Sequence, residues 1–493
     1  MTQQPRTPGA GTTFGVDFLG CKISLTDART ISEALAEAGH SATDARRDDA
    51  AARGIGVVNA CCITAEAERT SRRKVRIAVG ALEDSHGQVF VTGCGAANLP
   101  ERYEAIDPRV RVVPGAAGLA ARVIVEAADE LAGLGCRGPI AGVAPGHVAA
   151  APAVGPEATR RSRAFIKVQD GCDFSCSYCI VPAVRGAPRS RPLDTVLDEV
   201  RRRVALGQCE VVLTGVNIGL YRDAETRAGL DQVLAAVART DGVTRVRVSS
   251  IESNHVNKRL LAVMAGHPEI CPHLHVPLQS GDDAVLAEMG RHYDTRRYAR
   301  AVDLARKMLP GLNLTTDVIV GYPTEDDASF ARTLAFVEQM GFTKVHAFPF
   351  SQRPDTAAVA HADPVDRAVK AARGRRVRAV ADRAALAHRQ ARVGTMDEVL
   401  VELPRSARTR GGSGALLTDE HEASLDARSA APADAFRTGH TRDYSPVRFV
   451  SSPDCAVDAI PSGSVVVVSL DSVDAASGVL IARVTPSTPH GIG

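Results

Sequence analysis

The stretch DGCDFSCSYCI, residues 170–180, places three cysteines within eight residues as Cys172-x3-Cys176-x2-Cys179. Three thiolates at this spacing suit a soft metal or an iron–sulfur cluster. No Cys or His follows until Cys209, whereas a closed structural site normally needs a fourth ligand at comparable spacing. Three ligands on a four-iron cluster would leave one iron open, and an open coordination position is typical of a catalytic metal. We therefore expect a catalytic iron–sulfur site in this loop.

The region around the loop has the pattern of a barrel. Short apolar runs alternate with helical patterns of about 12 to 20 residues, roughly six times. The candidate strands are 164–168, 209–215, 244–250, 273–278, 312–321 and 343–350. Six such β/α units predict an open, partial (β/α)6 barrel, whose site would lie at the C-terminal ends of the strands. The cysteine loop follows the first strand and lies at that end.

The N-terminal region predicts a second α/β domain with a parallel sheet. Apolar runs at 14–20, 54–60, 88–93 and 110–113 are separated by helical stretches, one of them from Ser24, as N-cap, to Ala38. Cys21, Cys61 and Cys94 each end one of these runs. In a parallel sheet they would emerge on one edge, so a second three-thiolate site is compatible with the pattern, although buried packing is the alternative. Cys62 is expected to point away from Cys61.

The remainder of the chain predicts a linker, a basic helix and a small β-module. Residues 138–158 are rich in Ala, Pro and Gly, and the helix-like run 365–392 carries nine basic residues and one acid between Arg367 and Arg392. Beyond it, short apolar strands predict an all-β barrel, with a polar insert at 405–437. The predicted domains are therefore 12–137, 138–158 as a linker, 159–392 and 393–487.

Composition excludes several classes of protein. The chain has 493 residues, of which 45% are hydrophobic and 24% charged, so it is not wholly disordered or fibrous. A formal charge of +2 excludes a histone-like polycation but not a local basic face. The polar N-terminus and the absence of an apolar run of about 18 residues predict a cytoplasmic protein without a membrane partner. Eleven cysteines in a reducing compartment are then not a disulfide framework.

The cysteine spacing, with Tyr178 before the last cysteine, resembles the radical S-adenosylmethionine (SAM) superfamily. Further segments resemble the methylthiotransferases within it: GCK (20–22), VVNACCIT (57–64), VTGC (91–94), PRSRP (188–192), LTGVNIGLY (213–221), RVSSIE (247–252), LHVPLQSG (274–281), TTDVIVGYPTE (315–325) and FSQRPDT (350–356). GCK and CxxT look most like the tRNA branch that modifies N6-threonylcarbamoyladenosine, 3′ of the anticodon. Two segments depart from the family pattern: NACC at 59–62, where N-T-C is usual, and SIESN at 250–254, where a Pro often follows the Glu.

The resemblance implies two 4Fe-4S clusters. Cys172, Cys176 and Cys179 would hold the first, whose open iron binds SAM and generates a 5′-deoxyadenosyl radical that removes hydrogen from C2 of the adenine at position 37. An auxiliary cluster, which supplies the sulfur, would be held by Cys21, Cys61 and Cys94. The implied partners are tRNA, a one-electron reductant such as flavodoxin or ferredoxin, and a sulfur donor.

Residues for SAM binding follow from the same resemblance. They are Tyr178, Gly215, Asn217, Ser249, Ser250 and Gly321, most of them at strand ends. A strand-end turn residue without a ligand is the alternative for each. His273 and His275 alternate along one strand, so one of them is expected to face inward, as a core histidine rather than a catalytic base.

Candidates for RNA binding come from local concentrations of basic residues. They are Arg185, Arg189 and Arg191 after the cysteine loop, Arg373, Arg375 and Arg376 on the long helix, and Arg442 and Tyr444 in GHTRDYSPVRF (439–449), which resembles a TRAM domain. A solvated charged surface is the alternative.

Three other functions remain open on the sequence. The first is the same chemistry on N6-isopentenyladenosine in tRNA or on a ribosomal-protein aspartate. The second is an iron–sulfur RNA-binding or electron-transfer protein without radical chemistry. The third is a radical SAM enzyme whose second cysteine set is structural or holds zinc.

Overall fold

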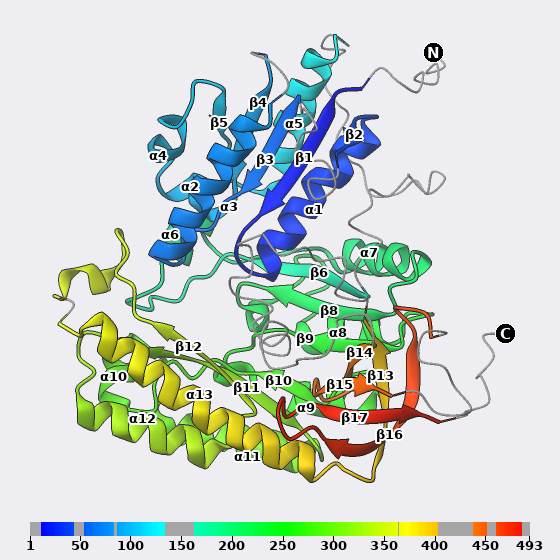
Figure 1. Ribbon diagram of the computed structural model, residues 1–493, viewed down its shortest axis with the longest axis vertical. Helices are drawn as coiled ribbons and strands as arrows, with labels where there is room; N and C mark the ends of the chain where they lie inside the picture. Colours follow the sequence, from blue (N-terminus) through cyan, green and yellow to red (C-terminus); the bar gives the residue numbers. More distant parts are fainter. Residues whose placement is uncertain are drawn as a thin grey trace. The chain divides into compact units, whose positions relative to one another are not determined.

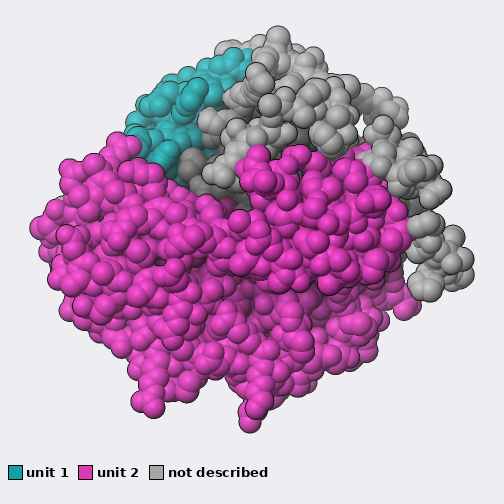
Figure 2. Space-filling view, turned by 60° about the horizontal axis from the view of Figure 1, so that its bottom comes forward, with its two compact units in different colours: residues 1–160, 180–187, 409–420 teal, residues 161–179, 188–408, 421–493 magenta. Residues whose placement is uncertain are grey.

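The computed structural model describes residues 11–43, 54–82, 86–133, 162–362, 364–402, 437–450 and 460–485. The chain divides into two compact units, coloured teal and magenta in Figure 2. Unit 1 comprises residues 1–160, 180–187 and 409–420, and unit 2 comprises 161–179, 188–408 and 421–493. The predicted linker at 138–158 and residues 405–436 of the predicted insert lie outside the described ranges. Among the helices of those ranges, none combines the length and apolar character needed to cross a membrane.

Unit 1 is built on a parallel five-stranded sheet, which confirms the predicted α/β fold (Figure 1). The strand order is β2 (Ser41–Ala42), β1 (Thr13–Phe18), β3 (Ile55–Asn59), β4 (Gln88–Thr92), β5 (Val110–Val112). One face packs on α1 (Lys22–Glu37) and α5 (Ala117–Leu131), and the other on α2 (Ala65–Gly80), α3 (Gly93–Asn98) and α4 (Glu101–Glu104). Because helices cover both faces of the sheet, a ligand would bind at the edge formed by the C-terminal ends of the strands.

The first helix begins earlier than predicted. Ser24 is not its N-cap, because α1 starts at Lys22 and Cys21 occupies the cap position. The cause is Gly20, whose φ of +108° lets the chain turn directly from the first strand into the helix. Thr64 does cap the second helix, since its hydroxyl accepts a hydrogen bond from the Ala67 N–H at 3.1 Å.

Unit 2 contains the six predicted parallel strands of an open barrel. They are β6 (Arg163–Asp170), β8 (Glu210–Gly215), β9 (Arg245–Val248), β10 (His273–His275), β11 (Asn313–Val320) and β12 (Lys344–Pro349). The first three pair in one sheet, with β7 (Arg189–Ser190) antiparallel at its edge, and the last three pair in another. Parallel bridges Val246–Ile270 and Ser250–His275 connect the two sheets.

Helices surround this open barrel (Figure 1). They are α7 (Leu193–Ala205), α8 (Leu230–Ala238), α9 (Lys258–Gly266), α10 (Asp283–Glu288), α11 (Thr295–Met308), α12 (Asp327–Met340) and α13 (Arg367–Gln390), with short 3-10 turns at η1 (Ile218–Leu220), η2 (Ser253–His255) and η3 (Ala357–Ala360). The short α6 (Val181–Arg185) belongs to unit 1.

The strands of the barrel separate an apolar outer face from a polar interior. Leu274, Leu314 and Val345 belong to the apolar core that the strands share with the helices. Side chains alternate along a strand, so the neighbouring residues His273 and His275 both face the opposite way, toward the interior. The expectation that only one of them does so was wrong, because residues two apart share a face.

The C-terminal region is a closed five-stranded barrel, as the short apolar runs predicted. Its strands follow the order β13 (Met396–Val401), β14 (Thr438–Thr441), β15 (Pro446–Phe449), β17 (Leu480–Val484), β16 (Val465–Val473). Closure removes the free strand edges that a small sheet would otherwise expose.

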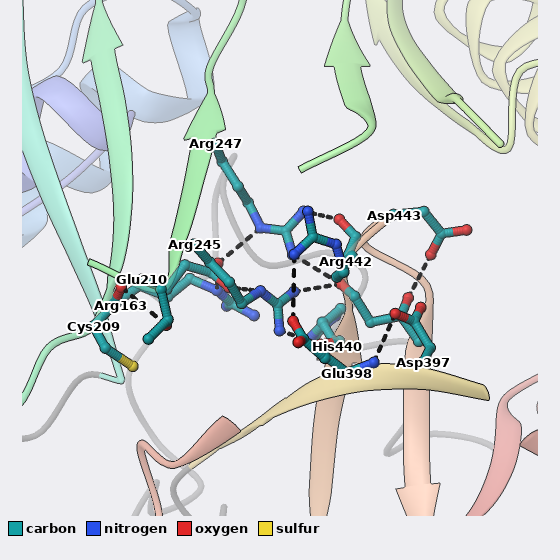
Figure 3. A network of polar contacts seen from close by, with 12 residues as sticks. Arg163, Cys209, Glu210, Arg245, Arg247, Asp397, Glu398, His440, Arg442 and Asp443 are labelled. Atoms are coloured by element: carbon teal, nitrogen blue, oxygen red, sulfur yellow. Dashed lines mark hydrogen bonds and ion pairs between the residues drawn. The ribbon is translucent and has the colours of Figure 1, made fainter. Parts of the chain in front are cut away.

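A buried polar network joins this small barrel to the N-terminal ends of the strands of the open barrel, within unit 2 (Figure 3). Glu210 pairs with three guanidinium groups: Arg163 Nε at 2.7 Å, Arg245 Nε at 2.9 Å and Arg247 Nε at 2.8 Å. Arg245 also donates to the carbonyl oxygens of His440 at 3.1 Å and Thr441 at 2.6 Å. The small barrel is therefore fixed at the end of the strands opposite the cysteine loop.

Candidate functional site

The cysteine loop leaves the C-terminal end of β6 through a glycine. Gly171 has φ +74°, which favours a residue without a side chain and turns the chain into the loop. Cys172, Cys176 and Cys179 form no disulfide among the described residues and are partly exposed. The Cys179 N–H donates to the Cys176 carbonyl at 3.0 Å, and the Phe174 N–H lies 3.4 Å from the Cys172 sulfur. The loop thus presents three available soft ligands on a hydrogen-bonded turn.

Arg291 contacts the loop, although no sequence pattern singled it out. Its Nη1 donates to the Cys176 sulfur at 3.1 Å and to the Tyr178 hydroxyl at 3.2 Å, while its Nη2 pairs with the Glu252 carboxylate. Its guanidinium also lies 4.8 Å from the centre of the Tyr293 ring. Burial would lower the pKa of Arg291, but Tyr178, Tyr293 and Glu252 together raise it. The residue is therefore a fixed cation beside a thiol of the site.

Two of the predicted SAM contacts carry buried polar atoms without partners among the described residues. Asn217 is 4% exposed; its N–H donates to Gln169 Oε1 at 2.8 Å, but its Oδ1 accepts no hydrogen bond there. The hydroxyl of Ser249, at the end of the next strand, is also buried and unpaired in the described structure. Burial raises the pKa of the Cys172 thiol, whereas the Phe174 N–H and the Asn217 side chain lower it. Unsatisfied polar atoms beside a set of thiols fit a polar ligand that binds at this edge.

The other predicted SAM contacts have neighbours within the protein. A Cβ at Gly215 would lie 2.9 Å from the Gln169 carbonyl oxygen, and one at Gly321 would lie 2.4 Å from Cγ of Lys370. Gly321 therefore accommodates the Lys370 side chain, and its approach to an adenine stays a prediction. Ser250 is half-buried and takes part in the bridge to β10.

The interior of the barrel holds one group of side chains with metal-ligand character among the described residues. Ligand atoms of His275, Asp317 and His346 all lie within 4.8 Å of one another. His275 Nε2 is 3.2 Å from the Asp317 carboxylate, and its Nδ1 is 2.9 Å from the Thr315 hydroxyl, which fixes the ring orientation. These residues add polar groups to the interior that the cysteine loop borders.

Unit 1 brings together the second set of cysteines at the C-terminal edge of its sheet. Cys21 follows β1 and is exposed, whereas Cys61, after β3, and Cys94, in the first turn after β4, are buried. Burial raises the pKa of Cys61 to about 12, with further increases from nearby Cys94 and Cys21. A Cβ at Gly20 would lie 3.0 Å from the Cys61 sulfur. The three cysteines therefore lie at one edge of the sheet, as the order of the strands predicted.

Cys62 differs from its neighbour. Its thiol donates to the Cys94 carbonyl at 3.3 Å, and its side chain packs in an apolar cluster with Ile180. Cys61 instead packs with Leu19 and Ala67. The two adjacent thiols thus occupy different surroundings.

The structure changes the account of the three arginines after the cysteine loop. Arg185 belongs to unit 1, where its Nε donates to the Cys94 sulfur at 3.0 Å and its Nη2 pairs with Asp27 at 3.1 Å. Arg191 pairs with Glu199 at 2.5 Å. Neither is a free surface cation, because each guanidinium is committed to a partner within its own unit. Arg189 is exposed at the edge strand.

The RNA-binding candidates on the long helix α13 also include both a buried, paired arginine and exposed arginines. Arg373 is buried and pairs with Glu325 and Asp327, each at 2.8 Å, whereas Arg375 and Arg376 are exposed on the same helix. The helical period places Arg373 on the packed face.

Arg442 and Tyr444 lie where the small C-terminal barrel meets the open barrel of unit 2. Arg442 pairs with Glu398 at 3.3 Å and donates to the Pro268 carbonyl. The Tyr444 ring lies 4.7 Å from the Arg247 guanidinium and 5.2 Å from that of Arg163. Both side chains therefore make contacts within unit 2, and nucleotide binding by them stays a prediction.

Comparison with known proteins agrees with this geometry. Residues 166–337 match the Radical SAM superfamily, and residues 13–115 match the uncharacterized protein family UPF0004. The threonylcarbamoyladenosine tRNA methylthiotransferase MtaB of Bacillus subtilis (strain 168) is 34% identical over 380 residues, which cover 76% of this chain and 81% of that protein. The chain belongs to the radical SAM methylthiotransferases. The MtaB protein of Thermotoga maritima is also 34% identical, over 70% of this chain and 76% of its own length.

A relative named for a different substrate is equally similar to this methylthiotransferase. The tRNA-2-methylthio-N(6)-dimethylallyladenosine synthase of Sorangium cellulosum is 34% identical over 83% of this chain and 86% of its own length. Among solved structures, the radical S-adenosylmethionine methyltransferase TsrM from Kitasatospora setae aligns with a TM-score of 0.51 and 15% identity, over 71% of this chain and 77% of that one. That likeness shows the fold alone.

Membership of the radical SAM family implies a 4Fe-4S cluster and SAM. The residues at the end of β6 fit both groups. Three cysteines on one turn offer the ligands for the cluster. The buried polar atoms of Asn217 and Ser249 that lack partners among the described residues offer hydrogen bonds at the adjacent strand ends.

Proposed function

We propose that this methylthiotransferase adds a methylthio group to C2 of N6-threonylcarbamoyladenosine at position 37 of tRNA, in the cytoplasm. The observation that carries the proposal is a second set of cysteines, Cys21, Cys61 and Cys94, at one sheet edge of a unit separate from the first. The MtaB names of two relatives support the branch, but a dimethylallyladenosine synthase is equally identical. The choice of branch therefore depends on GCK (20–22) and on Thr64.

Residues around the cysteine loop would bind SAM. Cys172, Cys176 and Cys179 would hold the cluster and leave one iron open for the amino and carboxylate groups of SAM. Asn217 and Ser249 would donate to or accept from polar groups of SAM, which satisfies their buried atoms. When bound, the cluster and SAM supply radical chemistry, which a purine C2–H bond needs because side-chain acids and bases cannot remove that hydrogen near neutral pH.

The cysteines of unit 1 would hold an auxiliary 4Fe-4S cluster as the source of the inserted sulfur. Burial keeps the Cys61 and Cys94 thiols protonated without metal, so cluster binding would release protons. The chemistry also needs a one-electron reductant such as flavodoxin or ferredoxin, and a sulfur donor that restores the cluster.

Mass spectrometry of tRNA nucleosides from cells with and without the gene tests the proposal. Loss of the 2-methylthio form of threonylcarbamoyladenosine, with accumulation of the unthiolated nucleoside, is the expected result. Loss of the 2-methylthio isopentenyl form instead would move the substrate to the sister branch. No change in either nucleoside would contradict a tRNA substrate and direct the search to the ribosomal-protein aspartate.

The Cys62→Ala variant is expected to keep its auxiliary iron and sulfide. Its thiol donates a hydrogen bond to the Cys94 carbonyl, and the loss of that bond should cost about 1 kcal/mol of stability. Iron and sulfide assays after anaerobic reconstitution measure the result, with Cys61→Ala as the variant that should lose the auxiliary cluster. If Cys62→Ala loses the iron and Cys61→Ala keeps it, the ligand is the other cysteine.

The double variant Arg375→Ala/Arg376→Ala is expected to weaken tRNA binding and to reduce its salt dependence. Removal of each phosphate-binding cation should lower the slope of log K against log salt by about 1. Filter binding or fluorescence anisotropy at several salt concentrations measures the slope. The matched control is Arg201→Ala on α7, whose exposed side chain pairs across one helical turn with Asp198 at 2.8 Å. An unchanged slope in the double variant would exclude this helix as a binding face.

A further inference from the structure

We propose that Arg185 is a positioning residue of the auxiliary site, which donates a hydrogen bond to the sulfur of Cys94 and raises the reduction potential of the cluster there. The inference rests on the proposed auxiliary cluster. It assigns to Arg185 a role distinct from the RNA contact that its position after the cysteine loop suggested.

The contacts of Arg185 come from two directions. Its Nε lies 3.0 Å from the Cys94 sulfur, and its Nη2 lies 3.1 Å from Oδ2 of Asp27 on α1. The side chains of Arg185 and Asp27 are 9% and 7% exposed. Asp27 therefore holds the guanidinium plane while Nε points to the sulfur, an arrangement in which the donor cannot rotate freely.

The segment that carries Arg185 is itself packed in unit 1. Ile180 is 2% exposed and lies in an apolar cluster with Cys62 and Cys94, against which Val184 also packs. Gly186, with φ +70°, ends the short helix directly after Arg185. Apolar packing at one end of the segment and the ion pair with Asp27 at the other keep the Arg185 Nε within hydrogen-bond distance of the Cys94 sulfur.

A cation at this place acts on the site through charge. The Arg185 guanidinium is positively charged, and its Nε donates a hydrogen bond to the Cys94 sulfur at 3.0 Å. The same interaction would favour added negative charge on a cluster that has Cys94 as a ligand. Because reduction adds an electron, hydrogen bonds and positive charge next to cluster sulfur raise the reduction potential. Loss of Arg185 should therefore lower it.

The experiment isolates the auxiliary cluster in the full-length chain. The parent protein for this experiment carries Ala in place of Cys172, Cys176 and Cys179 and is reconstituted with iron and sulfide. The midpoint potential of the remaining cluster is measured by a redox titration followed by electron paramagnetic resonance. Arg185→Gln is introduced into this parent, and its midpoint potential is compared with that of the parent. Arg109→Gln is the matched control, because Arg109 belongs to the same unit and pairs with Asp107 at 2.9 Å directly before β5, at the opposite edge of the sheet.

The expected result is a lower midpoint potential in Arg185→Gln at equal iron content, with no shift in Arg109→Gln. An equal potential in Arg185→Gln and its parent would overturn the inference. If Arg185→Gln holds no iron, Arg185→Lys is measured instead. This variant keeps the positive charge but lacks the Nε donor, so its midpoint potential should lie below that of the parent. A potential equal to that of the parent overturns the inference. A parent that binds no iron would instead contradict the auxiliary cluster itself.

Discussion

Replacement of Glu210 by Ala is expected to lower the free energy of unfolding of this methylthiotransferase by at least about 3–5 kcal/mol, the range for removing one partner from a buried ion pair. Glu210 is fully buried and pairs with Arg163, Arg245 and Arg247 (Figure 3). Arg245 is itself fully buried, so its charge cannot reach water once the carboxylate is gone. Three guanidinium groups would then face one another at the place where the two barrels of unit 2 meet.

The matched control is Glu338→Ala, another glutamate with an arginine partner. Its carboxylate lies 3.1 Å from Arg383, but both side chains are about two-thirds exposed, at 65% and 64%. Exposed pairs contribute about 0–1 kcal/mol because solvent screens them. Denaturant unfolding followed by circular dichroism measures both variants. Equal losses in the two would show that the Glu210 network does not hold the barrels together.

Acid should weaken the same network. The neighbouring arginines hold the pKa of Glu210 well below its ordinary value, and Arg163 with His440 does the same for Glu402. A depressed folded-state pKa gives stability that is present above the unfolded value of about 4.3 and is lost as the pH falls toward the folded one. Glu210→Gln should therefore flatten the fall in unfolding free energy below about pH 4, which denaturation at a series of pH values would detect.

The sequence could have predicted part of this network. Arg245 and Arg247 are two apart in an apolar strand, so they share one face, and Glu210 begins the strand before it. Charges at alternate positions of a buried strand need partners in the interior. The partners from the small barrel could not be predicted. Tyr444 has φ +71°, and that turn places its ring against two arginines.

The two cysteine sites could likewise be predicted from the sequence only in part. Sheet topology was sufficient to bring Cys21, Cys61 and Cys94 to one edge, because parallel strands end together. A further signal was present in the glycines directly before Cys21, Cys94 and Cys172, which all have positive φ and begin the turn at a strand end. The cations on the thiols were not predictable. Arg291 and Arg185 reach sulfurs 115 and 91 residues away, and only tertiary packing sets those distances.

Replacement of Cys176 by Ala is expected to reduce SAM cleavage to background. The cluster would keep two of three ligands, and the Arg291 Nη1 that now donates to the Cys176 sulfur at 3.1 Å would lose that acceptor. An unpaired donor on a buried guanidinium costs about 1–3 kcal/mol, so the geometry of the whole loop should relax as well. Formation of 5′-deoxyadenosine from SAM under strong reductant measures the reaction directly and needs no tRNA.

The control is Cys209→Ala, a half-buried cysteine in the same unit whose thiol lies 3.5 Å from the Gly463 carbonyl oxygen. It should cleave SAM at the rate of the parent. Iron content separates the two sites, because Cys176→Ala should lose the iron of the first cluster and keep the iron that the proposed auxiliary site in unit 1 would hold. Cleavage of SAM by Cys176→Ala at the parental rate would mean that the loop at the end of β6 does not hold the catalytic cluster. The reaction would then have to be sought at other cysteines of the chain; among those that the structure describes in unit 1, Cys61, Cys62 and Cys94 are buried and Cys21 is exposed.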